Sequence, residues 1–248
     1  MIPREASKAV ALRGISSLLG LPIGDLEDLR PGDLALVGLF NDHEDRVGFG
    51  ARFAARQIRY ASRPAYGMAA QAWATMPGRE RVFDVGDLNV FPLEPQRQCM
   101  ALQAQLASMF DVGARVVVVG GAMSLNGVVG AALGVCQAAS GLPSLRIGGR
   151  AQGAPGADPV PEGTGTTEPV FLEVVLDRLF DPAAGQHAAS RLLTTLRSLN
   201  LRQVRVAHLT GFAPELDLSA RRETALAAHV LEVLVQCLVE GGRDALAA

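Results

Sequence analysis

The chain has 248 residues, of which 49% are hydrophobic and 19% are charged, so it has enough apolar residues for one large α/β core. Its 23 Lys and Arg residues against 25 Asp and Glu give a net charge of -2, which provides no basic field for nucleic acid or an anionic membrane. We therefore predict a single domain over residues 1–248, with neither nucleic acid nor membrane as a partner.

The cysteines and the N-terminus indicate a cytoplasmic protein. Cys99, Cys136 and Cys237 are far apart and lie in apolar stretches, which predicts small buried residues in a reducing compartment and no disulfide or zinc framework. Residues 1–19 contain four charged side chains and no apolar region followed by a cleavage signal. Residues 116–145 carry no charge, but six glycines among them favour a buried strand, a turn and a closely packed helix over a membrane span.

The first half of the chain alternates strand and helix patterns. Residues 34–40 are an apolar run of strand length after a Pro-Gly-Asp turn. A helix is expected over residues 51–62, with its arginines turned away from an apolar face formed by Phe53, Ile58 and Ala61. A strand over residues 81–90 then leads to a helix whose apolar stripe consists of Cys99, Leu102, Leu106 and Met109.

The centre of the chain is the stretch from residue 115 to residue 124. Four consecutive valines predict a strand buried on both faces, and the Gly120-Gly121 pair predicts a tight turn after it. In open α/β sheets, ligands bind outside the carboxyl ends of the strands, so an active site is expected to begin at this turn. Ala122 and Met123 stand there, and neither side chain holds a hard metal ion or moves a proton.

The second half continues the alternation around one irregular tract. Residues 149–169 are rich in Gly and Pro and predict an exposed or mobile loop. The other expected elements are helices over residues 128–139, 192–199 and 226–237 and strands over residues 144–148, 170–176 and 204–209. This βαβα order predicts a parallel sheet covered by helices on both faces.

Several segments resemble one family in the right order. Residues 38–62 (GLFNDHEDRVGFGARFAARQIRYAS) are similar to the glycine-rich turn and GARF-type helix of ureohydrolases such as arginase, agmatinase and formiminoglutamase. Residues 82–90 resemble the family's D-x-GD strand end, residues 117–124 its LGGDHS strand, residues 171–183 its SFDIDVLDPA strand, and residues 216–226 the start of its last helix. The resemblance implies a three-layer α/β/α fold with a mainly parallel sheet.

The chain departs from the family wherever the family binds its two metal ions. Ala122 and Met123 replace the Asp-His pair of the LGGDHS motif. Gly148 and Arg150 stand in the DAHxD motif, and Leu176 and Arg178 stand in the DxD motif. Asp177 lies between the last two, where strand alternation would turn it away from the site, and Gly211 replaces the catalytic-site glutamate. We therefore expect no catalytic residue and no metal in this chain.

The remaining polar residues are expected to have structural roles or to line the vacated pocket. Asp84 and Asp87 are expected to brace a strand end, and together with Arg150 they are the candidates for lining the vacated pocket. No two of the four histidines (His43, His187, His208 and His229) have ligand spacing, so we expect them to face solvent or to make a single hydrogen bond. The Gly-Gly turn lacks the lysine of a phosphate-binding loop and the GxGxxG pattern.

The resemblance implies a non-catalytic subunit. Ureohydrolases form trimers and hexamers, so this chain is expected to support an active, metal-dependent paralogue carrying Mn or Ni, in an assembly of the metformin hydrolase type that acts on a guanidino or biguanide compound. The hydrophobic content and a mean hydropathy of +0.22 favour such a subunit contact. Two alternatives stay open: a homo-oligomeric regulatory protein that binds a guanidino ligand, and a metal-independent α/β enzyme.

Overall fold

The computed structural model describes residues 16–42, 50–62, 76–91, 93–121, 125–134, 143–148, 162–163, 170–180, 185–214 and 222–246. Within these residues, seven strands form one sheet in the order β2-β1-β3-β7-β6-β4-β5. The strands are β1 (Leu34–Gly38), β2 (Val82–Asp87), β3 (Arg115–Val119), β4 (Ser144–Gly148), β5 (Glu162–Gly163), β6 (Phe171–Val175) and β7 (Val206–Thr210). Every pairing is parallel except that of β4 with the short edge strand β5.

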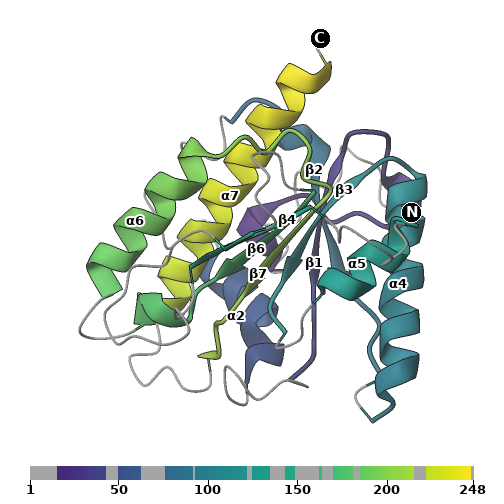
Figure 1. Cartoon of the computed structure of the whole chain (residues 1–248), viewed down its shortest axis with the longest axis horizontal. Helices are drawn as coiled ribbons and strands as arrows, with labels where there is room; N and C mark the ends of the chain where they lie inside the picture. The colour runs from purple at the N-terminus through teal and green to yellow at the C-terminus, as the bar shows by residue number, and fades with distance from the viewer. Residues whose placement is uncertain are drawn as a thin grey trace.

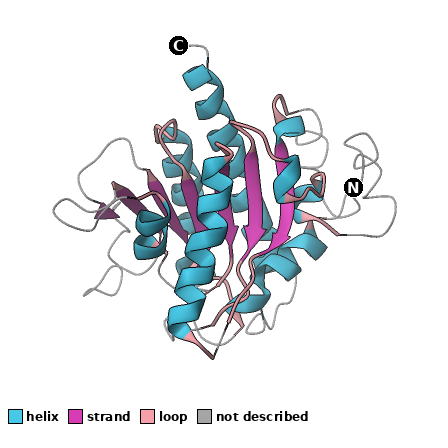
Figure 2. Cartoon of the chain, turned by 90° about the vertical axis from the view of Figure 1, so that its right-hand side faces the viewer, coloured by secondary structure: helices cyan, strands magenta, loops and turns pink. Residues whose placement is uncertain are grey.

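Helices cover both faces of this sheet (Figures 1 and 2). The α-helices are α2 (Ala54–Ala61), α4 (Pro95–Asp111), α5 (Asn126–Ala132), α6 (Gly185–Ser198) and α7 (Arg222–Leu246). The 3-10 helices are η2 (Leu18–Gly20), η3 (Leu26–Asp28), η4 (Ala51–Phe53), η6 (Arg79–Arg81) and η7 (Asp177–Phe180). Buried side chains of α2, α6 and α7 form a core on one face, and those of α4 and α5 form a core on the other. The predicted three-layer α/β/α fold with a mainly parallel sheet is confirmed.

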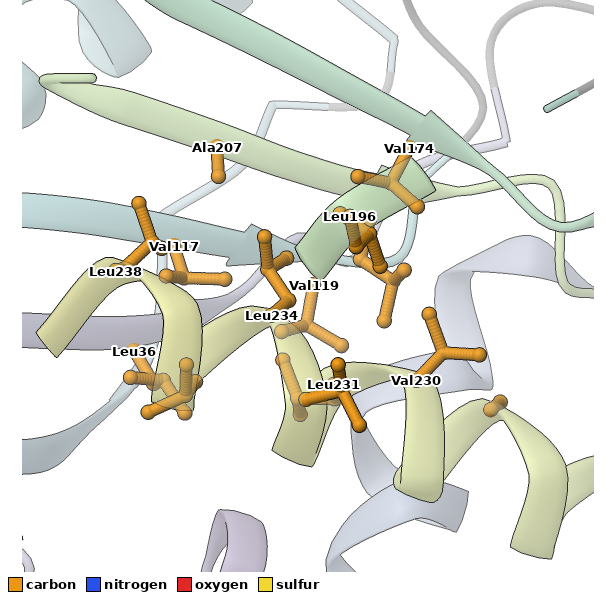
Figure 3. Close-up of a cluster of buried hydrophobic side chains, with 14 of the residues drawn as sticks. Leu36, Val117, Val119, Val174, Leu196, Ala207, Val230, Leu231, Leu234 and Leu238 are labelled. Atoms are coloured by element: carbon orange, nitrogen blue, oxygen red, sulfur yellow. The ribbon is translucent and has the colours of Figure 1, made fainter. Parts of the chain in front are cut away.

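The long helix α7 provides much of the larger core. Its Val230, Leu231, Leu234 and Leu238 lie against valines of the central strands (Figure 3). The segment Glu223–Gly242 is apolar and long enough to cross a membrane by length and composition, yet 56% of that window is buried within the fold. Its hydrophobicity is therefore explained by its place against the sheet.

The central valine strand forms as predicted. Val116–Val119 of β3 are all buried, and β3 pairs with β1 on one side and β7 on the other. The uncharged stretch that follows β3 continues into α5 and β4. The Gly/Pro-rich tract of residues 149–169 lies outside the described residues except for the backbone of β5.

The apolar stripe predicted for α4 is wrong at its first position. Cys99 is exposed, whereas Gln98 is 1% exposed and joins Leu102, Leu106 and Met109 on the buried face. The Gln98 side-chain oxygen accepts the backbone N–H of Phe91, while its amide nitrogen is buried without a hydrogen bond to a described residue. Cys237 is half-buried, and Cys136 lies outside the described residues.

The apolar face predicted around Phe53 also needs correction. Ala54, Ala55 and Ile58 form the buried face of α2, while Phe53 is only half-buried. Its ring lies 5.5 Å from that of Phe40, and the guanidinium groups of Arg52 and Arg56 stack over it at 4.7 Å and 4.5 Å. The ring thus forms a cation–π cluster near the surface.

Candidate functional site

The four strand ends at which the sequence departs from the ureohydrolase motifs that it resembles lie side by side. β3, β7, β6 and β4 are consecutive in the sheet and parallel, so their carboxyl ends meet at one edge. Gly148 and Leu176 are described there. Ala122, Met123 and Arg150 lie outside the described residues, as does the side chain of Arg178. Within the described residues, the tertiary structure thus places Gly148 and Leu176 at the same edge of the sheet, and the assignments of the other four positions stay predictions.

The turn after β3 needs glycine at both positions. Gly120 and Gly121 have φ angles of 83° and 77°, in the left-handed region that glycine adopts at no steric cost. A Cβ at Gly120 would lie 2.9 Å from the Cβ of Ala54, and one at Gly121 would lie 2.6 Å from the Leu39 side chain. The start of the GARF-type segment therefore packs directly against this turn, and the Gly121 N–H donates to the Ala51 carbonyl at 3.2 Å.

Apolar groups and backbone fill the neighbouring strand ends. Leu176 is fully buried after β6, and Phe212, 2% exposed, follows β7. A Cβ at Gly211 would lie 2.8 Å from the Leu176 nitrogen and 2.9 Å from the Asp177 nitrogen, at a φ of 81°. The backbones approach so closely that a glutamate at position 211 would have no room without movement of the β6 end.

Two polar side chains of β7 hold the Gly-Gly turn in place. The Thr210 hydroxyl donates to the Gly121 carbonyl at 2.7 Å, and His208 Nε2 lies 2.9 Å from the Gly120 carbonyl oxygen. His208 is completely buried, and burial lowers its pKa to about 4 while the Gly120 bond raises it in part. The imidazole is therefore neutral at physiological pH and donates through Nε2.

His208 also lies near an ion pair formed by side chains of the neighbouring strands β6 and β4. His208 Nδ1 is buried without a hydrogen bond to any described residue and lies 3.9 Å from the Glu173 carboxylate. Glu173 in turn pairs with Arg146 of β4 at 3.3 Å. The sequence predicted that each histidine faces solvent or makes a single hydrogen bond, and His208 makes the single hydrogen bond to Gly120. His187 and His229 are exposed as expected, while His43 lies outside the described residues.

The alternation argument for Asp177 does not apply. β6 ends at Val175, and Asp177 begins the 3-10 helix η7, in which side chains do not alternate between two faces. Its Oδ1 atom is buried and has no hydrogen bond to a described residue. Asp177 is thus the one carboxylate that the described chain places directly after these four strand ends.

Asp84 and Asp87 form a separate ionic cluster at β2. Arg59 donates from Nε and Nη2 to the two Asp84 oxygens, both at 2.9 Å, and from Nη1 to Asp87 at 2.6 Å. Asp84 is 2% exposed and also accepts the backbone N–H groups of Leu18 and Gly86. Burial lowers the Arg59 pKa, but hydrogen bonds and charge from the two aspartates more than offset it, so this pKa lies above its ordinary value.

This cluster braces the strand end, as one interpretation of the sequence predicted. Arg59 faces inward, which corrects the expectation that the arginines of this helix turn away from the core. β2 is the outermost strand on one side of the sheet, and β1, β3 and β7 separate it from β6 and β4. Asp84 and Asp87 therefore lie several strands away from the ends of β6 and β4. The sequence signal for this pairing was an arginine on the α-helix that comes before the D-x-GD strand in the chain.

The donors at the strand ends do not fit a dinuclear metal centre. Such a centre needs several carboxylates and imidazoles that converge on one point. Within the described ranges, no three His, Cys, Asp or Glu side chains gather closely enough to hold a metal ion. The sequence places Ala and Met at the two positions of the β3 turn beyond Gly121. No reaction step can therefore be derived through a metal held by these residues.

Comparisons with known proteins place the chain among ureohydrolase folds. The arginase family model matches residues 32–138, which span β1 to α5. Proclavaminate amidino hydrolase from Streptomyces clavuligerus superposes with a TM-score of 0.69 at 16% identity, covering 92% of this chain and 98% of its own. A hypothetical agmatinase from Burkholderia thailandensis gives 0.67 at 17% identity, with coverage of 96% and 94%.

A third similar structure is formimidoylglutamase from Bacillus subtilis subsp. subtilis str. 168, with a TM-score of 0.64 at 13% identity over 92% of this chain and 93% of its own. No curated protein sequence matches the chain. The chain therefore has the arginase/agmatinase-like ureohydrolase fold. The resemblance to the ureohydrolase family that the sequence indicated is confirmed.

Proposed function

We propose that this chain is a non-catalytic, ureohydrolase-like subunit that assembles with an active, metal-dependent ureohydrolase and supports it. The observation that carries the proposal is the content of the strand ends of β3, β7, β6 and β4. Glycine, leucine and buried phenylalanine occupy the edge where the family binds its two metals. The scaffold persists while the donor set does not.

The chemistry of the complex then belongs to the partner subunit. Mn or Ni in that subunit would activate a water molecule for attack on a guanidino or biguanide carbon, in an assembly of the metformin hydrolase type. The named similar structures are an amidino hydrolase, an agmatinase and a formimidoylglutamase, which agrees with a substrate of this general class. This chain would contribute subunit contacts in a trimer or hexamer.

Exposed apolar side chains at the start of α4 support a subunit contact. Leu93, immediately before the helix, is 94% exposed, and Met100 on the helix is 70% exposed. Large apolar side chains lose this unfavourable hydration when a partner covers them. Burial of both would contribute several kcal/mol to association, at about 1.5–3 kcal/mol for each side chain.

Co-expression tests the proposal directly. The chain and an active ureohydrolase encoded beside it should co-elute as one complex, whose guanidine or biguanide hydrolysis depends on both chains. Replacing a metal ligand in the partner should abolish turnover. Met123→His in this chain should add none, because the other ligands stay absent. Leu93→Ser combined with Met100→Gln should weaken the complex, whereas Leu26→Ser, at a side chain that is 36% exposed on η3, serves as the control.

Two results would overturn the proposal. The first is that this chain is a soluble monomer and that the ureohydrolase encoded beside it is fully active without it. The chain would then be better explained as a regulatory protein that binds a guanidino ligand. Guanidine hydrolysis by the purified chain alone would instead favour the metal-independent enzyme.

A further inference from the structure

A cavity opens at the amino ends of the strands, on the edge of the sheet opposite the strand ends described above. Its volume is about 220 Å³, and it lies between the starts of β1, β2, β3 and β7 and the last turns of α7. Strands of five residues place the two edges of the sheet roughly 16 Å apart. The cavity is therefore separate from the region where the family binds metals.

Four arginines line this cavity: Arg81, Arg115, Arg202 and Arg205. Three of them owe their proximity to the sheet, because Arg81 directly precedes β2, Arg115 begins β3 and Arg205 directly precedes β7. The backbone of Arg205 accepts the N–H of Val116 at 2.9 Å, which fixes the two strand starts next to each other. Among the described residues that line the cavity, none is Asp or Glu.

The contacts of Arg81, Arg115 and Arg205 leave part of their positive charge without a carboxylate partner among the described residues. Arg81 pairs with buried Asp33 at 3.1 Å and donates to the Pro31 carbonyl at 2.5 Å. Arg115 donates from Nη2 to the Leu238 carbonyl at 2.6 Å, but its Nη1 is buried with no hydrogen bond to a described residue. Nε of Arg205 is in the same state. Within the described ranges, the protein itself therefore supplies only one carboxylate, that of Asp33, to the three arginines at the strand starts.

The positive charges at the cavity repel one another. Burial and, to a smaller extent, the charges of Arg205 and Arg81 together lower the pKa of Arg115 to about 10. A dianion in the cavity would offset this repulsion.

Glycines leave the room that the guanidinium groups occupy. A Cβ at Gly242 of α7 would lie 2.5 Å from Nη2 of Arg115, and a Cβ at Gly32 would lie 2.7 Å from Nη2 of Arg81. The Gly242 contact places Arg115 directly against the helix. The absence of a side chain at Gly242 and Gly32 thus makes room for two of the guanidinium groups that line the cavity, beside apolar residues such as Leu34 and Val239.

We propose that this cavity binds a small multivalent oxyanion of the phosphate class, either free phosphate or the phosphoryl group of a small metabolite. Guanidinium groups present paired N–H donors that match the spacing of phosphate oxygens. The volume is below that of pockets for drug-sized molecules, which fits a phosphate-sized group. A cationic guanidino compound would be repelled, so this ligand is distinct from any substrate of the proposed complex.

Calorimetry and thermal melting of the full-length chain test this site with inorganic phosphate, pyrophosphate and glycerol 3-phosphate, against chloride at matched ionic strength. We expect saturable binding and a rise in melting temperature with ligand concentration. Tighter binding of glycerol 3-phosphate than of phosphate would identify a metabolite phosphoryl group, and the reverse order would identify free phosphate.

Charge-removing variants connect the binding to the cavity. Arg205→Gln should weaken binding by about tenfold or more, and adding Arg202→Gln should weaken it further. Arg97→Gln removes the same charge from the exposed start of α4 and should leave binding within twofold. Arg115 is not the first choice for substitution, because it also holds α7 through Leu238; circular dichroism without ligand verifies the fold of each variant.

Two outcomes would refute the site. One is the absence of saturable phosphate, pyrophosphate or glycerol 3-phosphate binding by the wild-type chain. The other is equal weakening by Arg97→Gln and Arg205→Gln, which would reduce the effect to net charge. Neither result depends on a metal or on the proposed partner subunit, so the two proposals can fail separately.

Discussion

The ion pair between Arg59 and Asp84 offers the sharpest test of how α2 is held against β2. The pair joins α2 to β2 through two hydrogen bonds of 2.9 Å, and the two side chains are 13% and 3% exposed. Arg59→Met keeps much of the side-chain volume but leaves the Asp84 carboxylate buried with only backbone donors. Breaking a buried pair in this way costs about 3–5 kcal/mol.

We expect the lower end of that range, about 3 kcal/mol, because Asp84 keeps the N–H groups of Leu18 and Gly86, at 2.7 Å and 3.0 Å. For a chain of this size the melting temperature should fall by roughly 6–12 °C. Urea denaturation followed by circular dichroism measures the free energy of unfolding. Adding Asp84→Asn to the Arg59→Met variant removes the stranded charge and should restore part of the loss.

A surface pair provides the matched control. Arg97 and Glu94 lie 3.1 Å apart with side chains 59% and 56% exposed, so Arg97→Met should cost no more than about 1 kcal/mol. The argument from burial is refuted if Arg59→Met costs no more than Arg97→Met, or if the double variant is less stable than the sum of the two single changes predicts.

Three further outcomes are expected. Gly211→Ala should lower the free energy of unfolding by about 1–3 kcal/mol, because a Cβ there is strained at a positive φ and also meets the backbone of Leu176 and Asp177. The control is Gly86→Ala, at a φ of 89° with no atom within 4 Å of the added Cβ, which measures the backbone strain alone. Equal losses in the two variants would contradict the close approach at β6. The pKa of His208 in the folded chain lies below its unfolded value, so its contribution to stability is complete above pH 6.5 and is lost as the pH falls to 4. Across this interval, the free energy of unfolding of the wild type should fall by about 3 kcal/mol relative to that of His208→Gln. Parallel pH profiles of the free energy of unfolding would argue against a buried neutral imidazole. Elemental analysis of the purified chain should find no stoichiometric manganese, nickel or zinc, and two tightly held equivalents would mean that the ligand assignment is wrong.

Much of the fold follows from local pattern. The valine run of β3 is apolar at every position, so it can only be an interior strand, and the alternation of strands and helices required parallel pairing. The absence of carboxylate and imidazole donors from the motif positions around β3, β4 and β6 is a property of residue type and spacing. The sequence therefore predicted the architecture, and the replacement of metal ligands at these motif positions stays a prediction made from the sequence.

The orientation of single side chains depended on contacts between distant segments. Gln98 rather than Cys99 faces the core because α4 is rotated to suit the sheet beneath it, and Arg59 turns inward because Asp84, 25 residues away, lies under α2. A one-residue change in helix phase turns a side chain by about 100° at little local cost. Helix periodicity alone does not determine that phase when small and polar residues border the apolar stripe.

The arginine cavity required the complete sheet order. Arg81, Arg115 and Arg205 are separated by 34 and 90 residues, and each is unremarkable in its own segment. Placing β7 directly beside β3 joins the start of the last strand to the start of the central one. Sequence specifies each strand through its own hydrophobic pattern, but the neighbours of a strand are chosen by packing of the whole core, because parallel pairing requires long crossovers and is stabilised only when both faces are covered.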